Sequence, residues 1–579
     1  MNRANPISAA VVRAALASNA REVFNQFVRT ALTPTIYDAF DFSVAIFDDQ
    51  CNVVADASGL PEYVGSLTFT VERLVEQFGR ENLADGDVLV SSDPYITGAH
   101  PPDMAIISPA FHDGQLIGFC AVRGHVGDVG ARNDYPADAR SVYEEGLVLP
   151  PMKLVSRGVL NSDVIDIVAA NSRMPRETVG NIRAAIGATH QGAIKLAKIV
   201  AAQGEPSYRL GIAELLDGSE TRVRALVEEL PDGDYFSTDV LDHDAIDDQP
   251  IALACRVRIR GSDIEVDVTG SAPQHYGALN VPYAQTVAAC RLALKRFTIQ
   301  DSVPANSGEY RCLSVVAPPG NIFNAQTPVG TFMMHVTASI LSEMVVNALL
   351  PVIKDRAPAP SGGHTTAFSA GFTTRDGRHM ASDDAAAIGY GALRGQDGAN
   401  ALQHFSISGI ATASAEVWEA TAPMLKERIS FVVDSGGPGR WRGGLGTQIV
   451  WRFETEANLT LQAQRTGDQR APGLDGGYPG AGRNDVQIAA GLPHERSYGM
   501  ATDVRLRAGE TVVLNGAGGA GFGNPRDRDP ETVELDVRCG YVSMAAAREY
   551  YGVVIDPATG LLDRTATSVL RGEGPGHDA

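Results

Sequence analysis

The sequence predicts an α+β protein of several domains, and three observations support this prediction. At 579 residues the chain is too long to fold around one ordinary hydrophobic core. Stretches with helical periodicity and stretches with strand-like alternation occur in separate blocks. The last third is rich in glycine, which is typical of a β-dominated domain with many tight turns.

The chain divides into domains where one kind of block gives way to another. We predict a mixed α/β domain over residues 1–231, which carries a candidate metal site, and a strand-then-helix region over 232–355. A glycine-rich, β-dominated domain is expected over 356–570 and a disordered tail over 571–579. The first boundary lies at a Pro-Asp-Gly turn, where helical segments give way to strands.

The first domain is expected to begin with an amphipathic helix over residues 7–32, because apolar side chains such as Val11 and Phe27 recur there at helical spacing. Two short strands follow in AFDFSVAIFDDQCNVVAD. Asp41 precedes the first of them, and on the pattern alone it is expected to be a carboxylate in solvent. The stretch LPEYVGSLTFTVERLVEQFG predicts a loop that leads into a helix, with Ser66 as its candidate N-cap.

A β-hairpin is predicted in the middle of this domain. The segments MAIISPAF and QLIGFCAV are apolar and β-prone, and the Asp-Gly pair between them suits a tight primed turn. Pairing outward from that turn places Asp103 opposite Gly124 and His125 opposite Pro102. A regular ladder with this register would put Asp103 and His125 on opposite faces, so irregular backbone is needed to bring them together.

The open end of this hairpin carries two motifs of the form His-x-x-Asp, His100 with Asp103 and His125 with Asp128. Two imidazoles and two or three carboxylates in one place suit a divalent cation such as Mn, Zn or Fe. One such motif is usually a hydrogen-bonding pair at the surface. Two of them at the same end of one hairpin favour a metal site.

The segment after the hairpin, NDYPADARSVYEEGLVLPPMKLVSRG, is expected to be a wrapping loop. It contains Glu144 and Glu145. A carboxylate so near a metal is a candidate general base, although exposed loop glutamates are more often simply solvated.

The remaining chain alternates between helical and strand-like blocks. Helices are expected over 163–230, strands in YFSTDVLD, IALACRVRIRG and DIEVDVTGSAP, and helices again within 280–352. In the glycine-rich part, Gly516–Gly521 matches G-x-G-x-x-G, but the Phe-Gly-Asn-Pro that follows prevents the helix that a dinucleotide site requires. We therefore interpret it as a structural turn. The chain has no G-x-x-x-x-G-K-[ST] phosphate-binding loop.

The composition argues against several kinds of partner. A net charge of −21 disfavours nucleic acid and anionic membranes. No apolar run is expected to reach the length of a membrane span, and the N-terminus lacks the features of an export signal. The six cysteines are scattered without a C-x-x-C pair, which favours free thiols in a reducing cytoplasm.

Several ordered blocks of the sequence resemble the hydantoinase B family, which is related to the α subunit of acetone carboxylase and to the C-terminal half of ATP-dependent 5-oxoprolinase. They are DFSVAIFD, DPYITGAHPPDM, GHVGDVG, EEGLVLPPMKL, DVTGSAPQ, FVVDSGGPGRWRGGLG, GGYPGAG and GAGGAGFGNPRDRDP. The blocks span nearly the whole chain, and DSGG-x-G-x-x-RGGLG is especially specific.

The resemblance implies a ligand set for the metal, namely Asp41, His100, Asp103 and His125, each of the residue type that the family's motifs have at that place. It therefore makes Asp41 a ligand, which the pattern alone left in solvent. It also makes Asp128 a partner that orients the ring of His125.

The chain departs from the family pattern in two places. Many members have Pro-x-His-Leu-Gly where this chain has PEYVG, so Tyr63 stands in place of a histidine. Many members also have Gly-Gly where this chain has Gly130-Ala131. These changes bear on the substrate more than on the metal.

The family implies a complex in which ATP is bound, and the substrate phosphorylated, by a partner of the hydantoinase A type. We therefore expect a cytoplasmic hetero-oligomer in which this chain is the metal-bearing subunit of an ATP-dependent cyclic amide hydrolase, with Asp128 or Glu145 as the general base. The alternative is a subunit of an ATP-dependent ketone carboxylase, which the length of the chain favours less. A third class is a non-catalytic scaffold that holds no stoichiometric metal.

Overall fold

The computed structural model describes residues 6–298, 305–374, 377–412, 414–467 and 472–572. The chain forms two compact units. Unit 1 comprises Met1–Ala348, Thr373–Ala381 and Phe405–Val417, and unit 2 comprises Leu349–Phe372, Ser382–His404 and Trp418–Ala579.

Helices and several sheets share the chain, which confirms the prediction of a multidomain α+β fold. The predicted boundary at 355/356 lies near the end of the first continuous segment of unit 1, and the predicted boundary at 231/232 lies inside that segment. The three-domain division therefore stays a prediction. Of the predicted tail, only Arg571 and Gly572 belong to the described residues.

The centre of unit 1 is a seven-stranded antiparallel sheet with the order β2-β1-β5-β4-β3-β6-β7. Its strands are β1 (Phe42–Asp48), β2 (Val53–Ser58), β3 (Val88–Ser91), β4 (Asp103–His112), β5 (Gln115–His125), β6 (Met152–Ser156) and β7 (Val159–Leu160). The unit's helices include α1 (Pro6–Thr30), α2 (Pro34–Tyr37), α3 (Pro61–Phe78), α4 (Pro94–Thr97), α5 (Ser162–Asn171), α6 (Pro175–Gln203), α7 (Glu205–Glu228) and α8 (Tyr283–Thr298).

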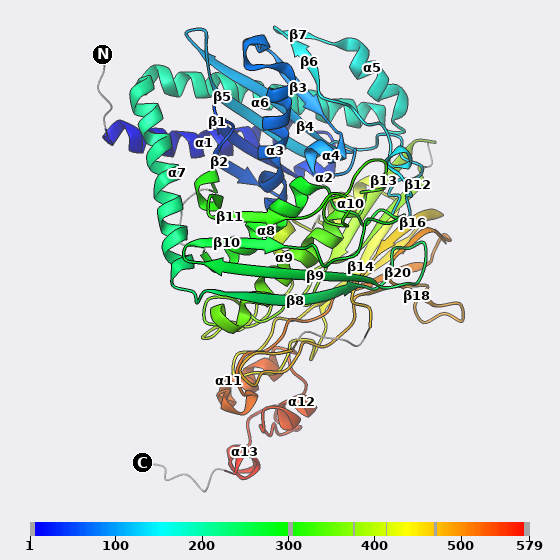
Figure 1. Cartoon of the computed structure of the whole chain (residues 1–579). Coiled ribbons are helices and arrows are strands. Elements are labelled where there is room, and N and C mark those ends of the chain that lie inside the picture. The colour runs from blue at the N-terminus through cyan, green and yellow to red at the C-terminus, as the bar shows by residue number, and fades with distance from the viewer. Residues whose placement is uncertain (1–5, 299–304, 375–376, 413, 468–471, 573–579) are drawn as a thin grey trace. The chain divides into compact units, whose positions relative to one another are not determined.

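Helices cover both faces of this sheet (Figure 1). On one face, α1, α6 and α7 pack against alternate side chains of the central strands, such as Val44 and Val122. On the other face, α3 packs against the intervening side chains, such as Ala45 and Ala121. Because side chains alternate along a strand, the register decides which residues face α3.

Helices α1 and α3 correspond to two helices that were expected from the sequence. α1 confirms the helix expected near the N-terminus. α3 begins at Pro61, earlier than expected, because a proline fits the first helical turn, where its missing N–H costs nothing. Ser66 therefore lies inside the helix and is not its N-cap, and Glu62 and Tyr63 belong to the first turn.

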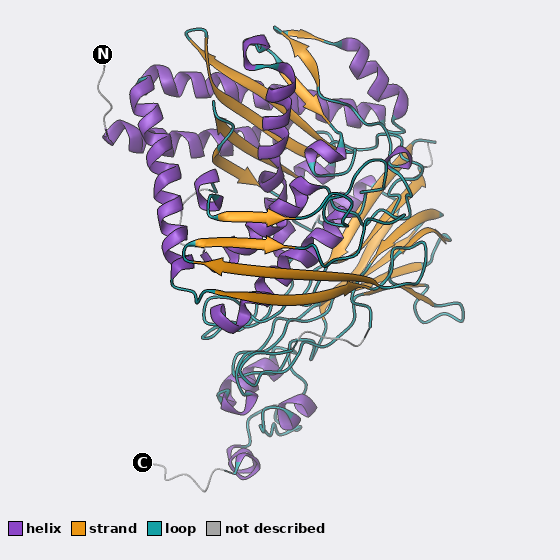
Figure 2. Cartoon of the chain, in the orientation of Figure 1, coloured by secondary structure: helices purple, strands orange, loops and turns teal. Residues whose placement is uncertain are grey.

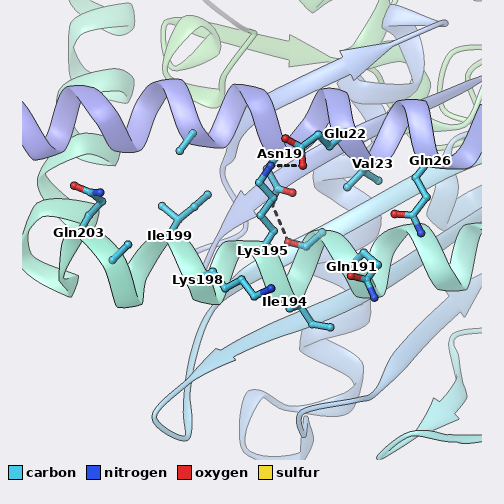
Figure 3. A pocket seen from close by; sticks show the side chains of 13 residues that line it. Asn19, Glu22, Val23, Gln26, Gln191, Ile194, Lys195, Lys198, Ile199 and Gln203 are labelled. Atoms are coloured by element: carbon cyan, nitrogen blue, oxygen red, sulfur yellow. Dashed lines mark hydrogen bonds and ion pairs between the residues drawn. The ribbon is translucent and has the colours of Figure 1, made fainter.

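Helices α1 and α6 enclose a cavity of about 490 Å³ (Figure 3). Asn19 donates from Nδ2 to the carbonyl of Gly192 at 2.9 Å, and Glu22 forms an ion pair with Lys195. These two pairs link α1 and α6 at the cavity.

A second sheet of unit 1 has the order β11-β10-β9-β8. Its strands are β8 (Gly233–Leu241), β9 (Ile251–Arg260), β10 (Asp263–Asp267) and β11 (Leu313–Val316), which confirms the expected run of three strands. Among the described residues, α9 (Met334–Ile353) is the one helix long and apolar enough to cross a membrane, so the expectation that no run reaches this length was wrong. In that helix, 78% of the apolar stretch is buried, which is typical of a core helix.

Most strands of two further sheets belong to unit 2, with the orders β13-β12-β16-β19 and β14-β15-β20-β17-β18. These strands are β12 (Thr366–Thr373), β13 (His379–Ala386), β14 (Met424–Phe431), β15 (Thr447–Phe453), β16 (Ala457–Gln462), β17 (Asp485–Ile488), β18 (Arg496–Tyr498), β19 (Ala501–Leu506) and β20 (Thr511–Asn515). The helices that follow α10 (Ala415–Thr421) are α11 (Pro530–Arg538), α12 (Met544–Glu549) and α13 (Arg564–Arg571).

The glycine-rich segments of unit 2 include extended chains packed side by side, where the sequence predicted tight turns. They are drawn as loops in Figure 2. Their backbones bond in several directions: the Gly444 N–H donates to Tyr390 at 2.7 Å, and the Gly519 N–H donates to Gly444 at 3.0 Å. The Gly437 N–H in turn donates to Gly519 at 2.8 Å. Gly519 lies in the G-x-G-x-x-G segment, so that segment is part of this array and the predicted turn was wrong.

Glycine is required in this array because no Cβ fits between the chains. A Cβ at Gly518 would lie 1.9 Å from the carbonyl oxygen of Ser435, and one at Gly389 would lie 1.9 Å from that of Gly444. Neither Gly518 nor Gly389 has a positive φ. The constraint is therefore space, not an unusual backbone dihedral.

We predict that Gly518→Ala lowers the free energy of unfolding by about 3 kcal/mol or more, because the neighbouring backbone has to move to admit a methyl group. The matched control is Gly467→Ala, since a Cβ there meets no atom within 4 Å. Calorimetric unfolding of both variants measures the difference. Equal melting temperatures for the two variants would contradict the close packing.

Candidate metal centre

A β-bulge in the hairpin β4–β5 brings Asp103 and His125 together. Next to the turn, the strands pair as predicted, but the register shifts by one residue between Ala110 and Phe111. Beyond the shift, Asp103 lies directly opposite His125, so the predicted pairing of Asp103 with Gly124 was wrong. Both side chains now share one face of the sheet, which is the face that α3 covers.

Asp41 joins this row from the neighbouring strand. β1 and β5 pair with Phe42 opposite Gly124, and the His125 N–H donates to the carbonyl of Asp41 at 3.1 Å. Asp41, His125 and Asp103 therefore lie side by side at the ends of three adjacent strands.

His100 is brought over this row by a four-residue turn. Its carbonyl accepts the Asp103 N–H at 2.9 Å, with Pro101 and Pro102 between them. Gly98, in the left-handed region with φ of 74°, ends α4 just before the turn. The His-x-x-Asp motif is therefore a turn whose two end residues approach each other.

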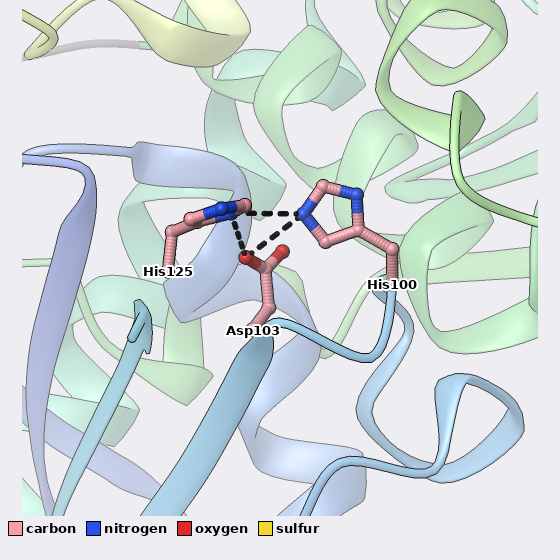
Figure 4. Close-up of side chains that lie close together, drawn as sticks. All are labelled: His100, Asp103 and His125. Atoms are coloured by element: carbon pink, nitrogen blue, oxygen red, sulfur yellow. Dashed lines mark hydrogen bonds and ion pairs between the residues drawn. The ribbon is translucent and has the colours of Figure 1, made fainter. Parts of the chain in front are cut away.

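Three donor atoms of these residues converge (Figure 4). The Nε2 atom of His100 lies 3.1 Å from Oδ1 of Asp103 and 3.2 Å from Nδ1 of His125. Nδ1 of His125 lies 3.2 Å from Oδ1 of Asp103. Nδ1–H of His100 donates to the carbonyl of Phe332 at 2.9 Å, which leaves a lone pair on Nε2 directed at the cluster.

Tyr63, in the first turn of α3, links the two carboxylates of the site. Its hydroxyl lies 2.7 Å from Oδ2 of Asp103 and 3.2 Å from Oδ1 of Asp41. The buried guanidinium of Arg123 lies 4.1 Å from the centroid of the Tyr63 ring and 3.7 Å from Oδ2 of Asp103. Arg123 therefore offsets the charge of Asp103 inside the protein.

Protonation in this cluster departs from ordinary values. Burial opposes ionisation of Asp103, but the imidazoles of His100 and His125 outweigh it and hold the pKa of Asp103 well below its usual range. Burial raises the pKa of Asp41 to about 6, against the attraction of His125. Burial and the two carboxylates hold the pKa of Tyr63 well above its usual range, so its hydroxyl stays a hydrogen-bond donor.

Two buried charges of this site were not predicted from the sequence. Arg123 follows the apolar run QLIGFCAV and precedes His125 by two residues, so it shares the face of His125, and a charge in such a run needs a buried partner. Glu62 is also buried, and its carboxylate makes no hydrogen bond to the described residues. Burial raises the pKa of Glu62 to about 8.

Glu145 acts on the site through a backbone segment. Its buried carboxylate accepts the N–H groups of Thr331 and Phe332 at 2.5 and 2.8 Å, and the Thr331 hydroxyl at 3.2 Å. The carbonyl of Phe332 is the one that accepts from His100. Burial raises the pKa of Glu145 to about 8 in spite of these bonds. Glu145 thus holds the segment that orients His100.

Asp128 is tied to Arg173. Its Oδ1 accepts from Nε of Arg173 at 3.1 Å and from the N–H of Gly130 at 3.2 Å. Burial opposes ionisation, but these bonds outweigh it and lower the pKa of Asp128. The predicted role of Asp128 in orienting His125 stays a prediction, and its contacts connect it to the segment after β5.

The donor set fits a divalent cation. Metal–ligand distances of about 2.1 Å place neighbouring ligand atoms about 3.0–3.4 Å apart in tetrahedral or octahedral geometry. The donor atoms of His100, Asp103 and His125 have separations of 3.1 and 3.2 Å. Buried lone pairs so close together are costly unless a cation or a proton lies between them. Two nitrogens and a carboxylate suit Mn, Zn or Fe. Asp41, next in the row, lies outside the group of ligand atoms within 4.8 Å of one another.

Comparison with known proteins identifies the family. The family model for Hydantoinase B/oxoprolinase matches residues 5–525. The chain belongs to this family. It is 32% identical over 585 residues to the beta subunit of the caprolactamase of Pseudomonas jessenii, a match that covers 99% of this chain and 100% of the relative. It is 28% identical over 604 residues to the B subunit of a putative D-/L-hydantoinase of Pseudomonas sp. strain NS671, covering 99% and 98%.

Two solved structures share the fold of this Hydantoinase B/oxoprolinase member. The crystal structure of the ATP-dependent caprolactamase from Pseudomonas jessenii has a TM-score of 0.88 at 30% identity, covering 99% of this chain and 100% of that one. Nucleotide-free acetone carboxylase has a TM-score of 0.87 at 19% identity, covering 98% and 83%, and this likeness shows the fold alone. The predicted family is confirmed, and the caprolactamase and hydantoinase relatives represent the predicted enzyme class.

We predict that Glu145→Gln reduces the dependence of stability on pH. A buried carboxyl with a raised pKa holds its proton in the folded state and loses it in the unfolded state, so wild-type stability falls as pH rises from about 4.5 to about 8. Glutamine keeps an oxygen for the two N–H groups and has no proton to lose. The melting temperature should therefore fall less for the variant over this range, by the equivalent of a few kcal/mol. Glu144→Gln is the control, and identical pH profiles for wild type and Glu145→Gln would contradict the assignment.

Proposed function

We propose that this chain is the metal-bearing subunit of an ATP-dependent cyclic amide hydrolase. A partner of the hydantoinase A type phosphorylates a lactam or hydantoin ring, and this chain completes its opening. The convergence of His100, Asp103 and His125, whose ligand atoms lie within 4.8 Å of one another, carries the proposal. Its support is the match, along the whole chain, to one subunit of a caprolactamase.

The cation would be held by Asp41, His100, Asp103 and His125. When bound, it supplies a Lewis acid that polarises a substrate oxygen and lowers the pKa of water toward neutrality. The chain's part is to present the ligands in fixed protonation states. The Phe332 carbonyl selects the tautomer of His100 that offers Nε2.

The chemistry divides naturally between two proteins of one complex. An unstrained amide resists water, and transfer of a phosphoryl group to its oxygen makes the carbon electrophilic and the oxygen a leaving group. The sequence of this chain has no G-x-x-x-x-G-K-[ST] loop, which agrees with ATP binding in the partner. Water adds to that carbon and the C–N bond breaks, which opens the ring as an acyl phosphate, and a second water then releases phosphate. The products are the ring-opened acid, phosphate and ADP.

The general-base role of Asp128 or Glu145 stays a prediction, and their contacts favour a different one. Glu145 already accepts three hydrogen bonds from Thr331 and Phe332, and Asp128 is bonded to Arg173. We therefore assign both residues to positioning: Glu145 holds the carbonyl that orients His100, and Asp128 anchors the segment after the ligand His125.

We predict that His100→Ala and His125→Ala each lose stoichiometric metal and reduce ATP-dependent ring opening at least 100-fold in the reconstituted complex, because each removes a nitrogen ligand. His112→Ala is the matched control, since His112 lies at the turn end of β4, beside Asp113. Elemental analysis gives the metal content, and a caprolactam or hydantoin assay gives the rate. A His100→Ala protein with full metal and full activity would refute the ligand role. A wild-type complex without metal would favour the scaffold class.

The fold shared with acetone carboxylase makes a ketone carboxylase the second candidate. We predict that ATP turnover by the complex depends on a cyclic amide and does not require bicarbonate together with acetone or acetophenone. Phosphate release with each set of substrates measures this. Turnover that appears only with a ketone and bicarbonate would select the carboxylase instead.

A further inference from the structure

A second cavity in unit 1, of about 420 Å³, lies between α3, α8 and the segment from Ala305 to Tyr310. It shares no lining residue with the metal cluster. Its walls include apolar side chains of Val53, Val64, Leu292 and Phe405. Three cationic side chains and one carboxylate also line it, so its charge is net positive.

Arg291 of α8, at this wall, has no carboxylate within ion-pair distance among the described residues, although Glu72 attracts it from farther away. Its two hydrogen bonds both come from Nη1, to the Gly65 carbonyl at 2.7 Å and to the Thr68 hydroxyl at 3.4 Å. Its Nε and Nη2 atoms make no hydrogen bond to the described residues. The two parallel N–H groups of the Nε and Nη2 edge therefore have no acceptor among the described residues.

Aromatic rings and burial define the surroundings of this guanidinium. It lies 5.2 Å from the centroid of Phe69 and 5.3 Å from that of Tyr310. These contacts stabilise a cation but leave its N–H edge unpaired. Burial lowers the pKa of Arg291, as expected for a charge whose lost hydration is not replaced.

The other charged groups of the cavity have local partners. Lys295 pairs with Glu309 at 2.9 Å, and Arg296 lies over the ring of Phe405 at 4.9 Å. Asp56 accepts the Ser58 hydroxyl at 2.7 Å and the Ala305 N–H at 3.2 Å. Asp56 is therefore engaged by Ser58 of its own strand and by Ala305, and it leaves the Arg291 edge for a ligand.

We propose that this cavity binds a small organic anion, whose carboxylate or phosphate group is held by the Nε and Nη2 edge of Arg291. The planar fork of an arginine matches both groups with two parallel hydrogen bonds. The apolar body of the ligand packs against Val64 and Leu292. An apolar cavity with one fixed charge is the common form of a small-molecule site. The site does not depend on the chemistry proposed for the metal cluster.

Isothermal titration of the full-length protein with three probes tests the site. Hexanoate carries a carboxylate and an apolar chain, inorganic phosphate carries the oxyanion alone, and hexylamine carries the same chain with the opposite charge. We expect saturable binding of hexanoate, phosphate or both, and none of hexylamine. The tighter of the two anions identifies the head group. Absence of binding by both anions, or binding of hexylamine as tightly as hexanoate, would overturn the proposal.

Variants locate the binding. Arg291→Met should weaken the binding of the anion at least tenfold, and Arg73→Met, on the exposed side of α3, should not change it. Equal affinity of wild type and Arg291→Met would overturn the proposal. Leu292→Phe keeps the arginine and fills the cavity, so it decides the matter if Arg291→Met does not fold. A folded Leu292→Phe protein with unchanged hexanoate affinity would also overturn it.

Discussion

The register of three antiparallel strands determines which ligand-type side chains meet in unit 1. Side chains alternate along each strand, so a slip of one residue moves a whole set of side chains to the other face. The bulge between Ala110 and Phe111 supplies that single step, and with it Asp103 and His125 lie on the face covered by α3. The contact between Tyr63 and Asp103 also depends on this alignment, because the register presents Asp103 to α3.

The site is rigidly supported, and its buried charges are tolerated because oppositely charged groups lie beside them. Asp103 is buried, and its negative charge is offset by Arg123 and by the imidazoles on either side. Glu145 accepts the N–H of Phe332, and the carbonyl of Phe332 accepts Nδ1–H of His100. These two hydrogen bonds fix the imidazole of His100. A divalent cation would complete such an arrangement, because it would replace the proton that two close nitrogen lone pairs otherwise have to share.

Much of this arrangement could be predicted from the sequence. The features that were not predicted have physical reasons. The Asp-Gly turn and its apolar flanks predicted the hairpin and placed both His-x-x-Asp motifs at its open end. The bulge was missed, although Gly118 within QLIGFCAV was its signal: a Cβ there would lie 2.2 Å from the Phe47 carbonyl, so an isolated strand glycine marked a close approach. Glu145 was expected in a wrapping loop as a candidate general base. Its buried contact with Thr331 was missed because a partner nearly two hundred residues away leaves no local pattern.

The extended glycine segments of unit 2 were missed for the same reason. A glycine-rich segment that forms turns and one that packs closely against other chains look the same in the sequence. Only the tertiary contacts distinguish them. Asp41 is a different case, since its local pattern favoured solvent and only the family resemblance marked it as a ligand. The structure places it beside His125, in the row that ends the three strands.

The central claim is that one cation lies among His100, Asp103, His125 and Asp41. Anomalous diffraction from crystals of the protein prepared with manganese, measured above the manganese absorption edge, tests this directly. We expect a single strong peak about 2.0–2.3 Å from Nε2 of His100, Nδ1 of His125 and a carboxylate oxygen of Asp103. A metal-replete crystal with no peak at that place, and with the two imidazoles turned away from each other, would contradict it.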